Sequence, residues 1–164
     1  LREIAKRVGV TPAGLLHHFA DKEELFAEVL RQRDEKVRQA AGDPAEHTLL
    51  AQARRVVAHN RASRGLTSLY AIVSAEATDS EHPSHADFAA RYRDRATEAE
   101  AILRLGQADG EVRDDIDPAL AARLISGVMD GIQLQWLLDD TVDMVALFDE
   151  FVRGYLLPPA EPRR

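Results

Sequence analysis

The first 25 residues hold two short helix patterns separated by a glycine, and this arrangement constrains the fold more than any other part of the sequence. Apolar side chains recur at the spacing of one helix face in Leu1, Ile4, Ala5 and Val8. Gly9 suits the left-handed turn that often ends a helix. Thr11 followed by Pro12 has the pattern of an N-cap and a first helical residue. Two helices joined by such a tight turn form a helix-turn-helix, whose second helix can lie in the major groove of DNA.

The turn and its flanks resemble the DNA-binding signature of TetR-type transcriptional regulators. That signature has an Ile-Ala pair, a Gly-Val-Ser/Thr turn, a His-Phe pair and a Lys that opens a long helix. The corresponding residues here are Ile4-Ala5, Gly9-Val10-Thr11, His18-Phe19 and Lys22. The family usually has Tyr two residues before the His, where this chain has Leu16. A three-helix DNA-binding unit needs one more helix than this sequence provides to close its small core. We therefore expect an N-terminal segment to precede this sequence.

Seven residues are candidates for DNA contact. The small or exposed residues that can approach base edges are Thr11, Ala13, Gly14, Leu16 and His17. We expect His18, which the resemblance places at the family's His, to contact a phosphate. We expect the same of Lys22, which follows Asp21, the expected N-cap of a third helix, and so lies where backbone N–H groups attract anions. The alternative interpretation is a helical hairpin without any role in DNA binding.

The charge distribution agrees with a local DNA-binding surface. The chain of 164 residues has a net charge of −7, yet residues 1–22 hold four Lys or Arg against two acidic residues. A basic N-terminal segment on an otherwise acidic chain still fits DNA binding, because only the surface that contacts DNA must neutralise phosphates.

Several other functions lack sequence support. The chain has no cysteine, which excludes disulfides and thiolate metal sites and suits a cytoplasmic protein. No apolar run approaches the ~18 residues of a membrane span. His82 and His85 form an HxxH pattern, but we interpret it as a solvated turn because no further ligands stand at useful spacing. No phosphate-binding loop or nucleophile motif is present, so we expect no enzyme, no catalytic residue, no cofactor and no metal.

The rest of the chain predicts an all-α fold with two domains. Residues 1–40 would form the DNA-binding domain with its connecting helix, and residues 41–164 the effector-binding and dimerisation domain. Helical periodicity is evident over 22–40, 44–63, 66–78, 85–108, 118–139 and 142–157. Two stretches, 110–118 and 130–136, also resemble the C-terminal domain of the TetR family, although this likeness is looser than that of the N-terminal part.

The middle helices combine aromatic and apolar side chains with few polar groups, which favours a ligand cavity. The candidate lining residues are Asn60, Tyr70, Phe88, Tyr92, Met129 and Gln133. For each of them ordinary core packing is about as good an interpretation.

The helix expected at 118–139 has two apolar stripes, so we expect one stripe to pack on the core of its own subunit and the other to be covered by another surface. Together with the last helix, it is the candidate dimer interface. The interface candidates are Ala121, Ile125, Val128, Gly131, Ile132, Trp136, Phe148, Val152 and Tyr155.

The resemblance implies a homodimeric regulator of transcription, most often a repressor, whose partners are double-stranded operator DNA, a second copy of the chain and a small-molecule effector. A membrane partner is not expected. The alternative, from a different class, is a helical small-molecule-binding or scaffold protein without DNA-binding activity.

Overall fold

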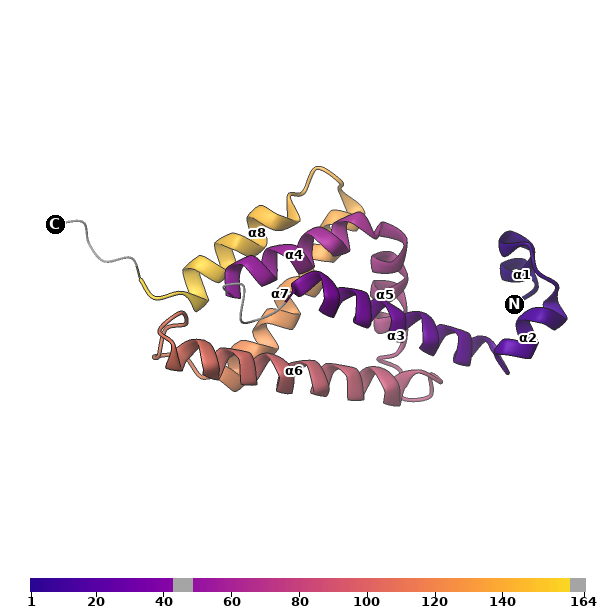
Figure 1. The fold of residues 1–164 in the computed structure, drawn as a ribbon, viewed down its shortest axis with the longest axis horizontal. Helices are drawn as coiled ribbons and strands as arrows, with labels where there is room; N and C mark the ends of the chain where they lie inside the picture. Colours follow the sequence, from indigo (N-terminus) through magenta and orange to yellow (C-terminus); the bar gives the residue numbers. More distant parts are fainter. Residues whose placement is uncertain (43–48, 160–164) are drawn as a thin grey trace. The chain divides into compact units, whose positions relative to one another are not determined.

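A computed structural model describes residues 1–42 and 49–159, and for residues 49 and 50 the backbone alone. Every regular element in these ranges is helical, which confirms the predicted all-α class. In chain order the helices are α1 (Arg2–Val8), α2 (Pro12–His18), α3 (Lys22–Ala41), α4 (Leu49–Ala62), α5 (Arg64–Glu76), α6 (His85–Ala108), α7 (Pro118–Leu138), α8 (Met144–Phe151) and the π-helical η1 (Val152–Leu156) (Figure 1). The predicted start of the fourth helix at residue 44 lies outside the described residues.

The chain divides into two compact units, Leu1–Lys36 and Val37–Arg164. The division falls inside α3, so one continuous helix contributes to both units. The domain boundary predicted at residue 40 lies in the same helix, near its end.

The first unit is built around a tight turn between α1 and α2. Gly9 ends α1 in the left-handed conformation with φ of 74°, and the N–H of Val10 donates to the carbonyl of Ala5 over 3.0 Å. The Thr11 side chain accepts from the N–H of Gly14 over 3.0 Å, as an N-cap does. Ala5 and Leu15 are the buried side chains of these two helices. The predicted helix-turn-helix geometry is therefore present.

The predicted capping pair at the start of α3 is also present. A carboxylate oxygen of Asp21 accepts from the N–H of Glu24 over 2.7 Å. The Glu24 side chain in turn accepts from the N–H of Ala20 over 2.5 Å, one residue earlier than in the usual reciprocal arrangement. This pair fixes where α3 begins.

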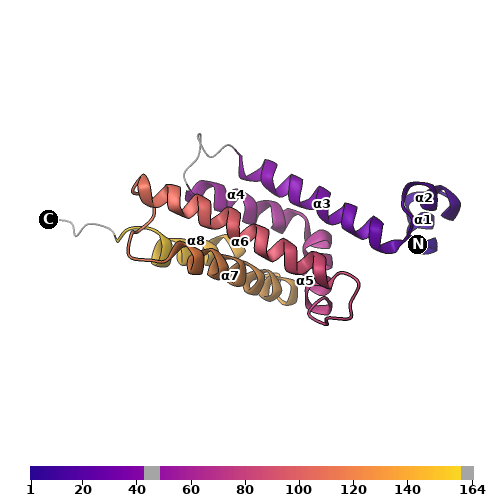
Figure 2. The ribbon, with the colours of Figure 1, turned by 90° about the horizontal axis from the view of Figure 1, so that it is seen from below.

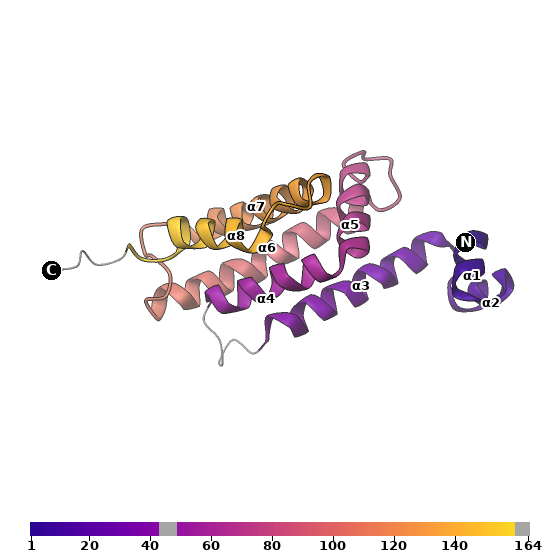
Figure 3. The ribbon, with the colours of Figure 1, turned by 90° about the horizontal axis from the view of Figure 1, so that it is seen from above.

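The second unit is a helical bundle in which α6 packs along α7, and α4 and α7 both pack on α8. Figure 2 shows α6 and α7 side by side, and Figures 1 and 3 show α5 crossing the bundle at one end. The core side chains come from α4, α6, α7, α8, η1 and the loop after α6, namely Val57, Leu103, Val112, Ala121, Ala122, Ile132, Trp136, Met144, Phe148, Val152 and Leu156.

The C-terminal helix is shorter than predicted and changes type. Residues 142–157 were expected to form one helix, but Asp143 caps the N–H groups of Val145 and Ala146, so α8 begins only at Met144. After Phe151 the helix widens into η1, and the N–H of Leu157 donates to the carbonyl of Val152, five residues earlier. The carbonyl of Leu156 accepts from the N–H of Arg113 over 2.9 Å, which joins η1 to the loop after α6.

Candidate DNA-binding surface and ligand cavity

The candidate DNA contacts lie on one exposed helix and at the start of the next. Of the seven, six are exposed in the structure, namely Thr11, Ala13, Leu16, His17, His18 and Lys22. Gly14 is half-buried, and a Cβ at that position would lie 3.1 Å from the hydroxyl oxygen of Thr11. Because this oxygen caps α2 by accepting from the N–H of Gly14, the hydroxyl proton of Thr11 is not used in that bond.

Lys22 is the first residue of α3, but the backbone around it is less open to anions than the sequence suggested. The N–H of Glu24 is already bound by Asp21, and that of Ala20 by Glu24. These two carboxylates occupy the N–H groups of Ala20 and Glu24, two of the donors at this end of the helix. The side chain of Lys22 is exposed at this end of the helix.

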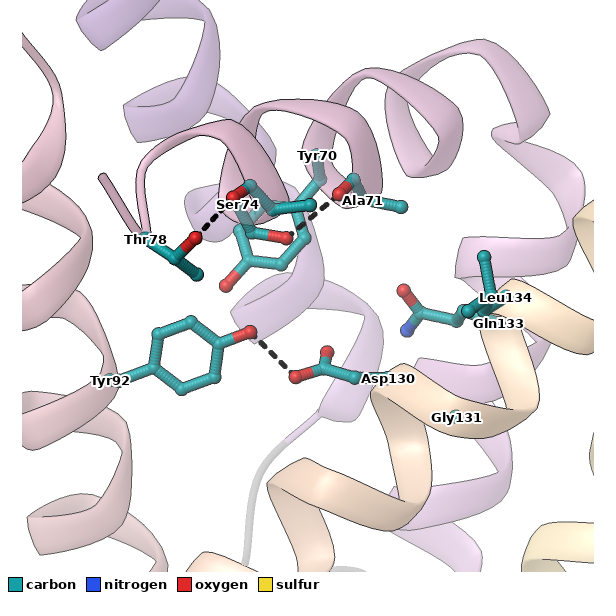
Figure 4. Close-up of a pocket in the computed structure, with 10 residues that line it drawn as sticks. Tyr70, Ala71, Ser74, Thr78, Tyr92, Asp130, Gly131, Gln133 and Leu134 are labelled. Carbon is teal, nitrogen blue, oxygen red and sulfur yellow. Dashed lines mark hydrogen bonds between the residues drawn. The ribbon is translucent and has the colours of Figure 1, made fainter. Parts of the chain in front are cut away.

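A cavity of about 370 Å³ lies within the second unit, between α5, α6 and α7. Figure 4 shows Tyr70 and Tyr92 on one side of it and residues of α7 on the other. The complete lining consists of Tyr70, Ala71, Ser74, Ala75, Thr78, Tyr92, Asp130, Gly131, Gln133 and Leu134. Its volume is within the range of small-molecule sites.

Three of the six predicted lining residues border this cavity: Tyr70, Tyr92 and Gln133. The other three, Asn60, Phe88 and Met129, are not among the residues that line it. Phe88 is buried with its ring centroid 5.4 Å from that of Tyr70. Asn60 is buried in α4, where its backbone carbonyl accepts from the hydroxyl of Thr67 over 2.9 Å. Met129 packs against the hydrophobic core.

Asp130 is the main residue of the cavity that sequence reasoning missed. Its carboxylate accepts from the hydroxyl of Tyr92 over 2.6 Å (Figure 4). Burial raises the pKa of the Tyr92 phenol, and the hydrogen bond to Asp130 raises that pKa further, so the phenol remains protonated and donates. An acidic residue between Met129 and Gly131 on a mostly apolar helix was the available signal.

A second polar contact borders the cavity at Tyr70. The guanidinium of Arg95 donates to the hydroxyl of Tyr70 over 3.1 Å and lies 5.1 Å from the centre of its ring. Arg95 is not among the residues that line the cavity. Its guanidinium lies beside Tyr70 at the edge of the site.

Comparison with known protein families agrees with both parts of the structure. Residues 1–29 match the family described as bacterial regulatory proteins, tetR family. Residues 45–157, more than half of the chain, match the family described as BetI-type transcriptional repressor, C-terminal. This protein belongs to the TetR family of transcriptional regulators. The comparisons with curated proteins and with solved structures returned no match.

For this TetR-family chain the structure corrects the residues assigned to the dimer interface. Five of the nine are buried in their own subunit and cannot be covered by another, namely Ala121, Ile132, Trp136, Phe148 and Val152. Ile125, Val128 and Tyr155 are half-buried and pack against the same core. Gly131 is exposed and borders the cavity. The core therefore uses the stripe of α7 that we had assigned to the partner.

The other stripe of α7 is the exposed one. Its large side chains are Leu120, Leu124, Leu134 and Leu138, with 62%, 47%, 54% and 82% of their surface exposed. Gly127 and Gly131 lie on the same face, and a Cβ at either position would meet nothing within 4 Å. This α7 leucine stripe is continuous along the helix and is not covered by residues 1–42 or 49–159.

The histidines at 82 and 85 lie in the turn before α6. The ring of His85 is 2.9 Å from the carbonyl of Ala77, and the ring of His82 accepts from the N–H of Ser84. In the described ranges no group of three or more His, Asp or Glu side chains is arranged to hold a metal ion. No helix there is both long and apolar enough to cross a membrane.

Proposed function

We propose that this TetR-family regulator is a homodimeric repressor that leaves its operator when a small molecule fills the cavity between α5, α6 and α7. The observation that carries the proposal is the cavity itself, which opens between three helices of the bundle, in a chain whose first unit has the exposed helix of a DNA-binding domain. A cavity of this size with a few oriented polar groups is typical of small-molecule sites.

The first unit would contact DNA through two kinds of residue. His18 and Lys22 would hold phosphates, which positions the protein without reading sequence. Thr11, Ala13, Gly14, Leu16 and His17 would approach base edges in the major groove. The exposure of most of these side chains supports this division, because none has to leave a packed position to reach DNA.

The second copy of the chain would cover the α7 leucine stripe. Apolar faces of this extent are usually buried in an interface, and a two-fold interface places the same surface of both subunits against each other. The open space at Gly127 and Gly131 permits close approach of two helices. The first units of the two subunits could then contact successive major grooves, about 34–36 Å apart, on a near-palindromic operator.

The effector would act by binding more tightly to the arrangement that does not fit DNA. A typical coupling is roughly 1–3 kcal/mol, which corresponds to a change of about 5–150-fold in DNA affinity. The helix α3 contains the boundary between the units and is their covalent connection. It is therefore the element through which a change in the helical bundle can reach the DNA-binding unit.

A DNA-binding experiment tests this function against the alternative of a ligand-binding protein without DNA activity. Bound fragments would be selected from genomic DNA with the full chain, and affinity for the best fragment would be measured over a range of salt concentrations. We expect a specific sequence, with an affinity that falls steeply as salt rises. Absence of salt-dependent retention on any fragment would contradict the regulator and favour the alternative.

A further inference from the structure

The side-chain amide of Gln133 borders the cavity and has no hydrogen-bond partner within residues 1–42 and 49–159. Gln133 belongs to α7 and is only 3% exposed. Figure 4 shows its amide directed towards the cavity. Buried polar side chains are nearly always hydrogen-bonded, because burying an unsatisfied one is costly. We therefore take this amide as a group that a ligand in the cavity can satisfy.

Other polar groups of the lining are already engaged within the protein. The hydroxyls of Ser74 and Thr78 donate to backbone carbonyls three residues earlier, over 3.0 and 2.7 Å (Figure 4). The carboxylate of Asp130 accepts from the hydroxyl of Tyr92 over 2.6 Å and takes part in a further interaction within the protein. These groups are therefore less free to orient a ligand than the Gln133 amide.

A carboxamide side chain carries an NH2 donor and a carbonyl acceptor side by side. A ligand satisfies both at once only if it offers an acceptor and a donor on the same side at the matching spacing. A primary carboxamide or a lactam does so, because its carbonyl and an N–H point the same way. A carboxylate offers only acceptors and an amidinium only donors, so each leaves one half of the Gln133 amide facing a like group.

We propose that Gln133 selects an uncharged ligand with a primary carboxamide or lactam group, whose carbonyl accepts from the NH2 of Gln133 while its N–H donates to the Gln133 carbonyl. The apolar remainder of the ligand would contact Ala71, Ala75 and Leu134, which line the same cavity. This inference rests on the proposed function only in taking the cavity as the ligand site, and it does not require DNA binding.

The test compares four planar probes of nearly equal size: benzamide, acetophenone, benzoate and benzamidinium. Their binding to the full chain is measured by calorimetry and by thermal shift at neutral pH and constant ionic strength. We expect benzamide to bind at least about tenfold more tightly than acetophenone, which is uncharged but lacks the donor, and more tightly than either ion. Equal binding of benzamide and acetophenone, preference for either ion, or no binding of benzamide would overturn the proposal.

Two variants locate the preference. Gln133→Met keeps a side chain of similar length without the amide, and it should reduce the benzamide-to-acetophenone ratio to near one while acetophenone binds as before. Gln135→Met makes the same change at an exposed position of α7 outside the lining and should leave the ratio unchanged. If Gln133→Met fails to fold, the probe series on the natural chain still decides. A ratio that Gln133→Met leaves unchanged, or that both variants abolish, would contradict the assigned role.

The outcome is separable from the proposed function. Preference for benzamide without any effect on DNA binding would retain this inference and contradict effector release. An operator-binding protein that shows no preference for benzamide would contradict this inference and leave the regulator standing.

Discussion

The guanidinium of Arg54 in α4 binds both carboxylate oxygens of Asp149 in α8, at 2.5 to 2.8 Å. Asp149 is buried, whereas Arg54 is partly exposed. The Arg54 hydrogen bonds hold the pKa of Asp149 below its ordinary value of 3.8. Because the carboxyl has a lower pKa in the folded chain, the pair stabilises the fold above about pH 4, and this contribution is lost as the pH falls through the lowered pKa.

Replacing Arg54 should therefore change both stability and its pH dependence. Arg54→Gln should lower the thermal midpoint at neutral pH, and the difference from the natural chain should shrink as the pH falls below about 4. The loss is partial, because Arg153 remains 3.7 Å from Asp149. Arg55→Gln, at the exposed neighbouring position, is the control. A difference between Arg54→Gln and the natural chain that is constant down to low pH would exclude this ionic role.

Gly106 marks a close approach between α6 and the loop that follows it. A Cβ at this position would lie 2.6 Å from a methyl group of Val112, which is buried in the core. Gly106→Ala should therefore cost about 1–2 kcal/mol in the free energy of unfolding, despite the better helix propensity of alanine. Gly65→Ala, where a Cβ meets nothing within 4 Å, should be neutral or stabilising. Urea denaturation measures both, and equal stability of the two variants would contradict the packing argument.

Lys22 should contribute affinity without sequence specificity. Lys22→Ala is expected to weaken specific and non-specific DNA binding alike and to lower the salt slope by about one unit. Lys36→Ala, about 21 Å further along the same helix, removes an equal charge and is the control. Fluorescence anisotropy at several salt concentrations gives both slopes. A loss restricted to one operator sequence would mean that Lys22 reads a base.

The α7 leucine stripe should hold the dimer together. Leu124→Glu places a charge in the middle of the proposed interface and should give monomers by analytical ultracentrifugation, while the helical content is retained. Ala58→Glu adds the same charge at an exposed position of α4 and should leave the dimer intact. A monomeric natural chain, or a dimeric Leu124→Glu variant, would exclude this interface.

The local signals in the sequence predicted the helices well, because each depends on a few neighbouring residues. Gly9, Thr11 and Asp21 occupy their expected turn and cap positions, and the helix predicted at 85–108 has those ends in the structure. The end of α8 was less predictable, since the helix widens at Val152 and its last carbonyl, that of Leu156, accepts from the N–H of the distant Arg113.

Which stripe of α7 faces the core was not encoded locally. Both stripes are apolar, so periodicity alone cannot decide between Trp136 and Leu134, of which the first is buried and the second exposed. The choice depends on packing against α6 and α8. Asp130 was missed for a related reason, because its role depends on Tyr92, which is 38 residues away in the chain.

The most direct test of the account is to measure operator affinity with and without a saturating cavity ligand, and ligand affinity with and without operator. We expect the ligand to weaken operator binding by about 5–150-fold and the operator to weaken ligand binding by the same factor. Affinities that do not depend on the other partner would contradict the claim that the cavity controls DNA binding.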